Sequence, residues 1–224
     1  MTPTETLRDT VLADWQAVAA HPFTLALAEG SLPAARMAAY LVEDYRFVEE
    51  FARLLAAAVA LAPDMAALVP GAQFLAVITG PENTYFLRSF AALGVPEAAH
   101  AAPPAPETET FLALMREARA SGRAERMLAV LVVAEWSYLS WASPHHPADA
   151  ALPFWLGEWI TLHAGPGFEA VVAHLRGRLD ALWPALSAAD QAAATDMFAR
   201  AVRAERAFFD AAWQRWSLEL PDQV

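Results

Sequence analysis

The sequence predicts an all-α protein, folded as a single-domain multi-helix bundle over residues 1–224. Apolar side chains recur at positions i, i+3, i+4 and i+7 in every long segment, which is the period of a helix with one buried face. Ala, Leu, Arg and Glu, which favour helices, are abundant throughout. No segment alternates apolar and polar residues as a half-buried strand does, and we find neither a repeat nor a linker between domains.

In the N-terminal half we expect helices over residues 4–20, 33–62, 65–78 and 81–94. The start of the second helix is marked by Ser31, which precedes Leu32 and Pro33. Proline suits the first turn of a helix, because the N–H that it lacks has no partner there.

In the C-terminal half we expect helices over residues 107–120, 124–142, 152–163, 166–183 and 188–217. Gly122 separates the first two of these, and Ser187 with Asp190 three residues later resembles a capping box at the start of the last. The stretches 98–106 and 143–149 are expected to be loops, because clustered prolines cannot continue a helix.

The composition excludes several classes of function. A net charge of −11 leaves no basic patch for binding nucleic acid. The chain has no Cys and no Lys, which excludes disulfides, thiolate ligands, cysteine nucleophiles and Schiff bases. No apolar run reaches the ~18 residues of a membrane span, and no secretory segment is apparent. We therefore expect a cytoplasmic protein without a membrane partner.

The same composition predicts self-association. Hydrophobic residues make up 57% of the chain and charged residues only 18%. A chain this apolar buries a substantial core and is expected to cover part of its surface with other subunits. We expect a homodimer or a homotetramer.

Asp44 falls on the apolar stripe of the helix expected over residues 33–62. The stripe consists of Leu41, Val48, Phe51 and Leu55. The charged side chains expected on the opposite side are Glu43, Arg46, Glu50 and Arg53. An ionised carboxylate among apolar neighbours costs several kcal/mol unless it is paired or hydrogen-bonded. Its presence on this face therefore needs a reason.

Glu135 and Glu205 repeat this pattern on two later helices. Glu135 interrupts the apolar run AVLVVAEWSYLSWA (129–142) and has Tyr138 three residues after it. The stripe around Glu205 comprises Phe198, Ala201, Val202, Phe208, Phe209, Ala212, Trp213 and Trp216. Aromatic side chains three or four residues after an acid supply walls for a flat ligand. Burial among them raises the pKa of a carboxyl toward neutrality, where it serves acid–base chemistry.

Each candidate residue also has a structural alternative. An arginine or a tyrosine from another helix could satisfy any of the acids, and Ser137 could satisfy Glu135. His163, at the end of a short helix, could cap that helix or line a pocket. No Glu-x-x-His pair and no Gly-rich nucleotide loop occurs, so the sequence predicts neither a metal nor a cofactor.

Several motifs, in their order along the chain, resemble the TenA family, the thiaminase II-like branch of the haem-oxygenase-like helical fold. They are HPFTLALAEGSLPAARMAAYLVEDYRFVEEF (21–51), PETETFLALMREARASGRAERMLAVLVVAEWSYLSWA (106–142), FWLGEWITLHAGPGF (154–168) and ERAFF (205–209). The resemblance covers nearly the whole chain. It implies a haem-oxygenase-like bundle that binds an aminopyrimidine and assembles as a homo-oligomer.

The resemblance also implies roles for individual residues. Asp44 and Glu205 match the acids that hold an aminopyrimidine by its ring nitrogen and its exocyclic amine, and Glu205 also matches the catalytic acid–base. Tyr138 and Phe208 match residues that line the pocket. The positions where many members have tyrosine hold Phe47, Phe111 and His163 in this chain.

The main departure from the family is at the nucleophile. Classical members have Cys-x-Trp-x-Tyr, where this chain has Ala134-Glu135-Trp136-Ser137-Tyr138. The chain is therefore similar to the cysteine-free TenA_E-type subgroup, whose members resemble aminopyrimidine salvage hydrolases. Without the thiol, cleavage of thiamin through a covalent intermediate is disfavoured, and water activated by a carboxylate is the natural replacement.

The expected function is that of an aminohydrolase in thiamin salvage. It would remove the amine from an aminomethyl or formylaminomethyl pyrimidine, with Glu205, Glu135 and Asp44 as the catalytic residues. One alternative is a non-catalytic pyrimidine-binding or regulatory protein on the same fold. Another is a divergent oxidative member related to haem oxygenase or PqqC, which is disfavoured because no histidine obviously supplies a proximal ligand.

Overall fold

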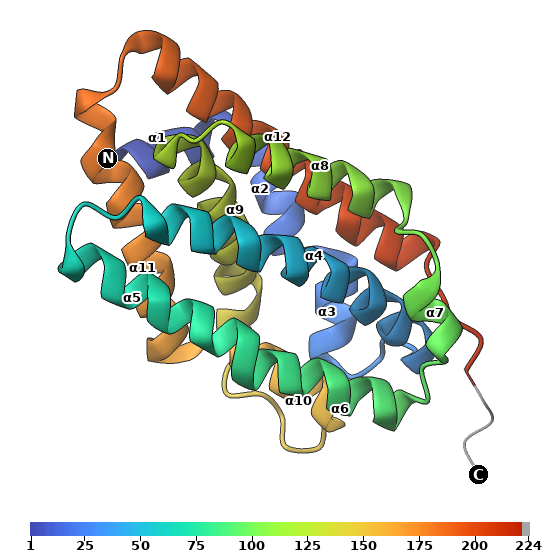
Figure 1. Cartoon of the computed structure of the whole chain (residues 1–224). Helices are drawn as coiled ribbons and strands as arrows, with labels where there is room; N and C mark the ends of the chain where they lie inside the picture. Colours follow the sequence, from blue (N-terminus) through green and yellow to red (C-terminus); the bar gives the residue numbers. More distant parts are fainter. Residues whose placement is uncertain (221–224) are drawn as a thin grey trace.

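The computed structural model describes residues 1–220, and helices account for most of them (Figure 1). The α-helices are α1 (Pro3–Thr10), α2 (Leu12–Ala19), α3 (Pro22–Ala28), α4 (Ala34–Ala60), α5 (Met65–Val77), α6 (Asn83–Leu93), α7 (Glu97–Ala101), α8 (Pro106–Ala120), α9 (Ala124–Ala142), α10 (Phe154–Leu162), α11 (Gly165–Leu182) and α12 (Ala188–Gln214). Short turns of other helix types are the π-helical η1 (Ile78–Glu82) and the 3₁₀ turns η2 (Ser143–His145) and η3 (Trp183–Ala185). The described residues contain no strand, which confirms the all-α class.

The helix α9 forms the centre of the bundle. Its residues 127–138 are all buried, because a helix that is apolar on every side must be covered on every side. It packs against α11 and α12, and also against α2, α4 and α8. In Figure 1, α4 crosses in front of α9, with α5 and α6 running alongside α4. The interior therefore lies between the long helices α4, α9 and α12.

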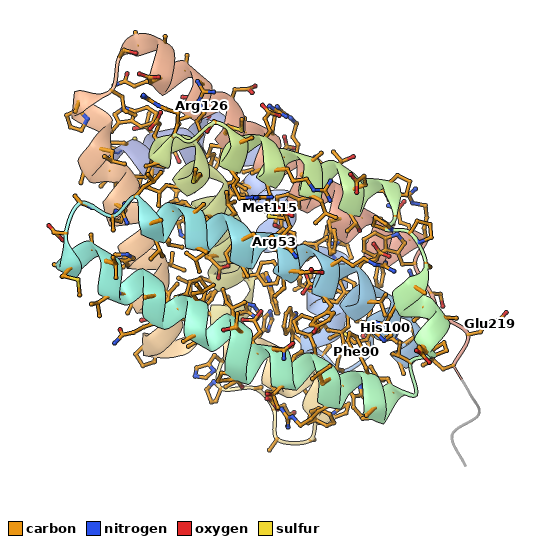
Figure 2. The ribbon with its side chains drawn as sticks, viewed as in Figure 1. Arg53, Phe90, His100, Met115, Arg126 and Glu219 are labelled. Atoms are coloured by element: carbon orange, nitrogen blue, oxygen red, sulfur yellow. The ribbon has the colours of Figure 1, made fainter. Side chains whose placement is uncertain are left out.

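Side chains fill the space between these helices (Figure 2). Met115 on α8 is fully buried in the interior. The short helix α7 packs onto α6 through His100 and Phe90, whose ring centroids are 4.6 Å apart. Among residues 1–220 we find no helix with the length and apolar character needed to cross a membrane.

Several predicted helix boundaries are confirmed. Ser187 accepts a hydrogen bond from the backbone N–H of Asp190 at the start of α12, as expected of a cap. Gly122 separates α8 from α9 with a φ of 65°, a left-handed conformation that favours glycine. The expected start at Ser31 is wrong in detail, because α4 begins at Ala34 with Pro33 in the cap position and without a side-chain cap.

Other predicted boundaries are wrong. The helix expected over residues 4–20 is broken at Val11 into α1, which packs on α11 and α12, and α2, which packs on α12 and α9. Both halves contact α12, but α1 also packs on α11 and α2 on α9, so the two halves follow different axes. The helix α3 was not expected, α7 lies in an expected loop, and α12 ends at Gln214 rather than at residue 217.

The solvent exposure of two side chains differs from the prediction. Glu50 is buried rather than exposed, because α8 covers this side of α4. The guanidinium of Arg119 donates to the Glu50 carboxylate, with an Nη2–Oε1 distance of 2.7 Å. Trp213 is exposed rather than part of the core, because it lies in the last turn of α12 with the guanidinium of Arg36 over its ring.

Candidate functional site

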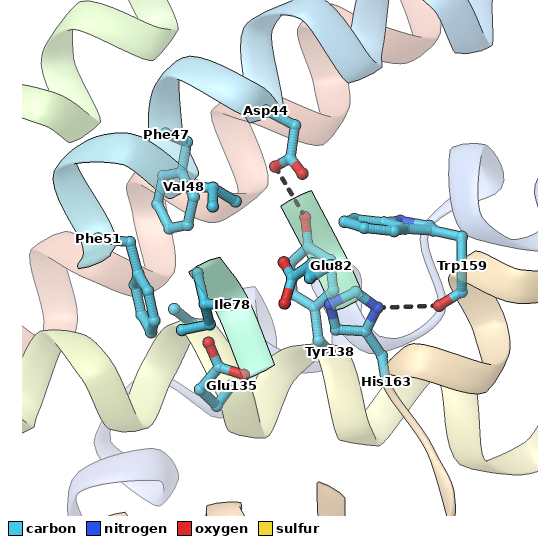
Figure 3. A pocket seen from close by; sticks show the side chains of 11 residues that line it. Asp44, Phe47, Val48, Phe51, Ile78, Glu82, Glu135, Tyr138, Trp159 and His163 are labelled. Atoms are coloured by element: carbon cyan, nitrogen blue, oxygen red, sulfur yellow. Dashed lines mark hydrogen bonds between the residues drawn. The ribbon is translucent and has the colours of Figure 1, made fainter. Parts of the chain in front are cut away.

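Three acids from three separate elements line one buried pocket (Figure 3). They are Asp44 from α4, Glu82 from η1 and Glu135 from α9. Each side chain is less than a tenth exposed. The residues that line the pocket are Asp44, Phe47, Val48, Phe51, Ile78, Glu82, Ala134, Glu135, Tyr138, Trp159 and His163. The structure thus brings Asp44 and Glu135 together at one cavity, whereas Glu205, the third acid expected there, does not line it.

The free space between these side chains is small. The volume in which the centre of a water molecule fits is about 20 Å³. One water molecule needs ~10–15 Å³ of such volume, so the cavity has room for only one or two. A pyrimidine ring therefore enters only when the walls move apart. Val48 and Ile78 also line a surface groove that lies between α4 and the η1 segment. These two side chains lie between the pocket and that groove, and we expect a ring to enter between them.

Asp44 is held by a tyrosine pair. The hydroxyl of Tyr138 approaches Asp44 Oδ1 at 3.5 Å, which is a long hydrogen bond. The hydroxyls of Tyr138 and Tyr40 lie 2.6 Å apart. Since Tyr138 donates to Asp44, the proton between the two tyrosines comes from Tyr40. The pair thus fixes the Tyr138 ring in the pocket wall and aims its hydroxyl at the carboxylate.

His163 serves both of the roles that the sequence left open. It ends α10 as the C-cap residue, and it lines the pocket. Its Nδ1 lies 2.9 Å from the carbonyl oxygen of Trp159. A carbonyl only accepts, so Nδ1 carries the proton and Nε2 keeps a free lone pair. Burial lowers the pKa of His163 to about 4, so the ring is neutral at physiological pH.

The walls of the pocket are aromatic. Phe47, Phe51 and Trp159 line it directly. Phe111 and Phe208, which were also predicted to line it, form a layer behind Phe47, with ring centroids 4.8 Å and 6.4 Å from the Phe47 ring. Both are buried, so they support the wall rather than face the cavity.

Glu205 is 2% exposed and does not line the cavity. It is nevertheless coupled to the site, because its charge contributes to the raised pKa of Glu135 and the charge of Asp44 contributes to the raised pKa of Glu205. Its Oε2 has no hydrogen-bond partner among residues 1–220. A buried carboxyl oxygen without a partner is costly, and such groups in native proteins call for a functional explanation. None of the three predicted acids pairs with an arginine in the described part of the chain.

Burial raises the pKa of all four acids, and for three of them the charge of neighbouring acids adds to the effect. Burial raises the pKa of Asp44 well above its ordinary value, and the charge of Glu82 adds to the effect. Burial likewise raises the pKa of Glu205, with a further contribution from Asp44. For Glu135, burial is again the largest cause of a raised pKa, followed by the charges of Glu82, Glu205 and Asp44. Burial alone raises the pKa of Glu82 to about 8.

The pocket lining contains no arginine to balance these acids, and its one histidine, His163, is neutral. Several carboxyls this close together cannot all ionise, so near neutral pH the group holds both protonated and ionised members. Such a mixture supplies a proton donor and a proton acceptor in one place. Among the described residues, no three histidine or acidic side chains gather closely enough to hold a metal ion.

Glu135 reaches the cavity itself. It lies next to Ala134, and both residues line the pocket even though successive helical residues point about 100° apart. Ser137, considered as a partner for Glu135, instead donates to the carbonyl of Ala134 at 3.1 Å. The small alanine side chain leaves room beside the carboxyl group of Glu135.

Glu82 is the acid that the sequence reasoning missed. It follows Gly80 and Pro81, a pair that reads as a turn, and it lies on no apolar stripe. A usable signal was nevertheless present, because Tyr85 and Phe86 stand three and four residues after it. The same spacing of aromatic residues after an acid had identified Asp44, Glu135 and Glu205.

The chain is similar in sequence to known proteins along most of its length. The family described as TENA/THI-4/PQQC matches residues 8–215. An aminopyrimidine aminohydrolase of Halalkalibacterium halodurans is 26% identical over 202 residues, which is 89% of this chain and 90% of that protein. An aminopyrimidine aminohydrolase of Helicobacter pylori is 24% identical over 204 residues, covering 89% of this chain and 93% of that protein.

The fold is also similar to solved structures. A TenA homologue from Pyrococcus furiosus superposes with a TM-score of 0.84 at 20% identity, over 94% of this chain and 100% of that one. A domain with a haem-oxygenase-like fold from Shewanella denitrificans superposes with a TM-score of 0.67 at 16% identity, over 94% and 92% of the two chains. The predicted haem-oxygenase-like bundle is thereby confirmed.

Proposed function

We propose that this chain, which belongs to the TENA/THI-4/PQQC family, is an aminopyrimidine aminohydrolase. It would release the amine from an aminomethyl or formylaminomethyl pyrimidine by hydrolysis of a C–N bond. The observation that carries the proposal is the gathering of unpaired acids around one aromatic pocket. The two aminopyrimidine aminohydrolases similar to this chain support it.

The pocket offers the features that a flat, nitrogen-rich ring requires. Phe47 and Trp159 provide faces for stacking, with Phe111 and Phe208 behind them. Asp44 and Glu205 are the acceptors proposed for the ring nitrogen and its exocyclic amine, and Glu205, which does not line the present cavity, becomes accessible when the walls move apart to admit the ring. The Tyr138 hydroxyl holds Asp44, and the neutral His163 presents Nε2 as a further acceptor.

Hydrolysis without a thiol requires an activated water molecule. The water oxygen bonds to the carbon that bears the amine, while the bond from that carbon to nitrogen breaks. The water loses a proton to an ionised carboxylate, for which we propose Glu135, because it lines the pocket where classical members have their nucleophile one residue earlier. Glu205 gives its proton to a departing nitrogen that is uncharged, as in the formylaminomethyl form, whereas an amine bound as ammonium leaves as ammonia without a further proton.

The test is an assay of the purified protein with the aminomethyl pyrimidine, following the hydroxymethyl pyrimidine and ammonia that hydrolysis forms. We expect turnover by the wild type and a loss of roughly 10²–10⁴-fold in kcat for Glu205→Gln. Asp196→Asn is the matched control, since Asp196 lies on the same helix and is exposed. Its activity should equal that of the wild type.

Two outcomes would overturn parts of this proposal. Pyrimidine binding without any product would favour the non-catalytic alternative on the same fold. Full turnover by Glu205→Gln would remove that residue from the mechanism and leave the hydrolysis to the other acids.

We further propose that the chain forms a homodimer or a homotetramer. Four apolar side chains at the end of α4 and along α5 are exposed: Leu61, Met65, Val69 and Val77. Such a row is costly in water and suits a contact between copies. A monomer in light scattering would contradict this, and the cytoplasmic location stays a prediction.

A further inference from the structure

Glu82 owes its buried position to an irregular helical segment. The five residues of η1 continue α5 into α6 as a π-helical turn. Pro81 within it has no N–H to donate to the preceding turn, so the regular α-helical pattern cannot pass through this point. Single π-helical turns inside α-helices occur frequently at functional sites. Here the turn places the Glu82 side chain in the pocket, near the centre of Figure 3.

The carboxyl group of Glu82 has no hydrogen-bond or ion-pair partner among residues 1–220. The side chain is 8% exposed, and burial is the only influence on its ionisation. Taking a carboxyl out of water without replacing its hydrogen bonds is destabilising. The Glu82 carboxyl therefore lowers the stability of the folded protein, which is expected when the partner of this carboxyl is a bound molecule.

The groups that face Glu82 identify the chemistry of that molecule. They are Asp44 from α4, Glu135 and Tyr138 from α9, and His163 from the end of α10. The two carboxyls and the free Nε2 of His163 accept hydrogen bonds, while the Tyr138 hydroxyl already points to Asp44. This end of the pocket thus offers several acceptors and negative charge. It fits a cation with several N–H donors.

We infer that the Glu82 carboxylate binds the protonated amine of an aminomethyl pyrimidine and selects this substrate over pyrimidines with an uncharged substituent. The inference rests on the proposed function of the pocket and adds a specificity-determining residue to it. An alkyl ammonium group has the three N–H donors that the surrounding acceptors require. Neither a hydroxymethyl nor a formylaminomethyl substituent carries the charge.

The assignment also explains how product leaves. Hydrolysis replaces the ammonium by a hydroxyl, so the product loses its charge pair with Glu82 and is left facing a desolvated carboxyl. In the empty pocket burial raises the pKa of Glu82 to about 8, and an arriving cation favours the ionised form. Binding of the ammonium substrate therefore releases a proton from the pocket, and departure of the uncharged product takes one up.

The inference is tested by comparing the dissociation constants of two pyrimidines of nearly equal shape. The aminomethyl and hydroxymethyl forms of the same pyrimidine differ in charge at one group. Stopped-flow tryptophan fluorescence measures the dissociation constant of the aminomethyl form before turnover, using Trp159 in the pocket wall as one reporter, and calorimetry measures that of the hydroxymethyl form. The proteins are the wild type, Glu82→Gln, Glu82→Asp and Glu158→Gln.

We expect the wild type to bind the aminomethyl form at least about tenfold more tightly than the hydroxymethyl form. Glu82→Gln should lose this preference and bind the hydroxymethyl form as the wild type does. Glu82→Asp keeps the charge and should retain part of the preference. Glu158→Gln removes a charge from the partly exposed face of α10, outside the pocket, and should behave as the wild type.

Equal affinity of the wild type for both compounds would overturn the inference, whatever the variants do. An unchanged preference in Glu82→Gln would overturn it as well. If the wild type still hydrolyses the aminomethyl form in either case, the proposed function stands without this role for Glu82. A wild type that neither binds nor hydrolyses these pyrimidines overturns both proposals.

Discussion

The unpaired carboxyl of Glu82 should make the stability of the folded protein fall as the pH rises. Its pKa is about 8 in the folded protein and 4.5 without the fold. The folded state therefore holds this proton over a range in which the unfolded chain has lost it. By linkage, the free energy of unfolding decreases across that range, by up to about 1.4 kcal/mol per pH unit for one group.

The cleanest window for this effect lies between pH 6.5 and 8. Burial lowers the pKa of His21, His163 and His174 below 6.5, so the stability that these histidines add rises with pH mainly below that value, and the remainder above it is common to all the proteins compared. Above it, Glu82 continues to titrate until about pH 8. Between pH 6.5 and 8, the titration of Glu82 lowers the free energy of unfolding by about 1.5 kcal/mol. This corresponds to a decrease of roughly 3–6 °C in Tm for a chain of this size.

The assay is thermal unfolding of the wild type, Glu82→Gln and Glu158→Gln at pH 6.5 and pH 8. The wild type should lose roughly 3–6 °C more than Glu82→Gln between the two values, because the other buried acids titrate in both proteins. Glu158→Gln should follow the wild type. Equal losses in the wild type and Glu82→Gln would refute the claim that Glu82 is protonated in the empty pocket.

Three further substitutions test other parts of the site and fold. Tyr138→Phe removes the hydroxyl that donates to Asp44 and should raise KM in steady-state kinetics roughly 2- to 12-fold. An unchanged KM would show that this contact does not contribute to substrate binding. Val48→Phe narrows the way in between α4 and η1 and should raise KM with kcat unaltered; a lower kcat alone would place the passage elsewhere. Glu50→Ala removes the carboxylate that Arg119 contacts and should lower the free energy of unfolding by about 0.5–1.5 kcal/mol in urea titrations, because the partly exposed Arg119 regains water. Catalysis should stay intact.

Periodicity predicted the long helices well, since each buries a continuous apolar face. The helix expected over residues 124–142 is α9 with the same boundaries. Gly122 and Ser187 were predictable helix boundaries, because a left-handed glycine and a capping serine act on the residues next to them. The break at Val11 escaped prediction, because it follows from the two halves packing on different helices. Glu50 escaped for a similar reason, since its partner Arg119 approaches from another part of the chain.

The site residues were likewise predictable only where the local sequence pattern marks them. Asp44, Glu135 and Glu205 were predictable because each interrupts an apolar stripe and precedes an aromatic side chain at helical spacing. Glu82 has the aromatic spacing without the stripe, because Gly80 and Pro81 interrupt the helix before it. A π-helical turn of this kind depends on the helices that continue on both sides, which the local sequence does not reveal.

The most direct measurement of the central claim is a crystal structure of the protein with the hydroxymethyl pyrimidine bound. We predict a ring stacked against Phe47 and Trp159, with its nitrogens within hydrogen-bond distance of Asp44 and Glu205 and its substituent directed at Glu82. A pyrimidine bound in a surface groove, with the acids still enclosing a cavity of the present size, would contradict the claim that they form one substrate site.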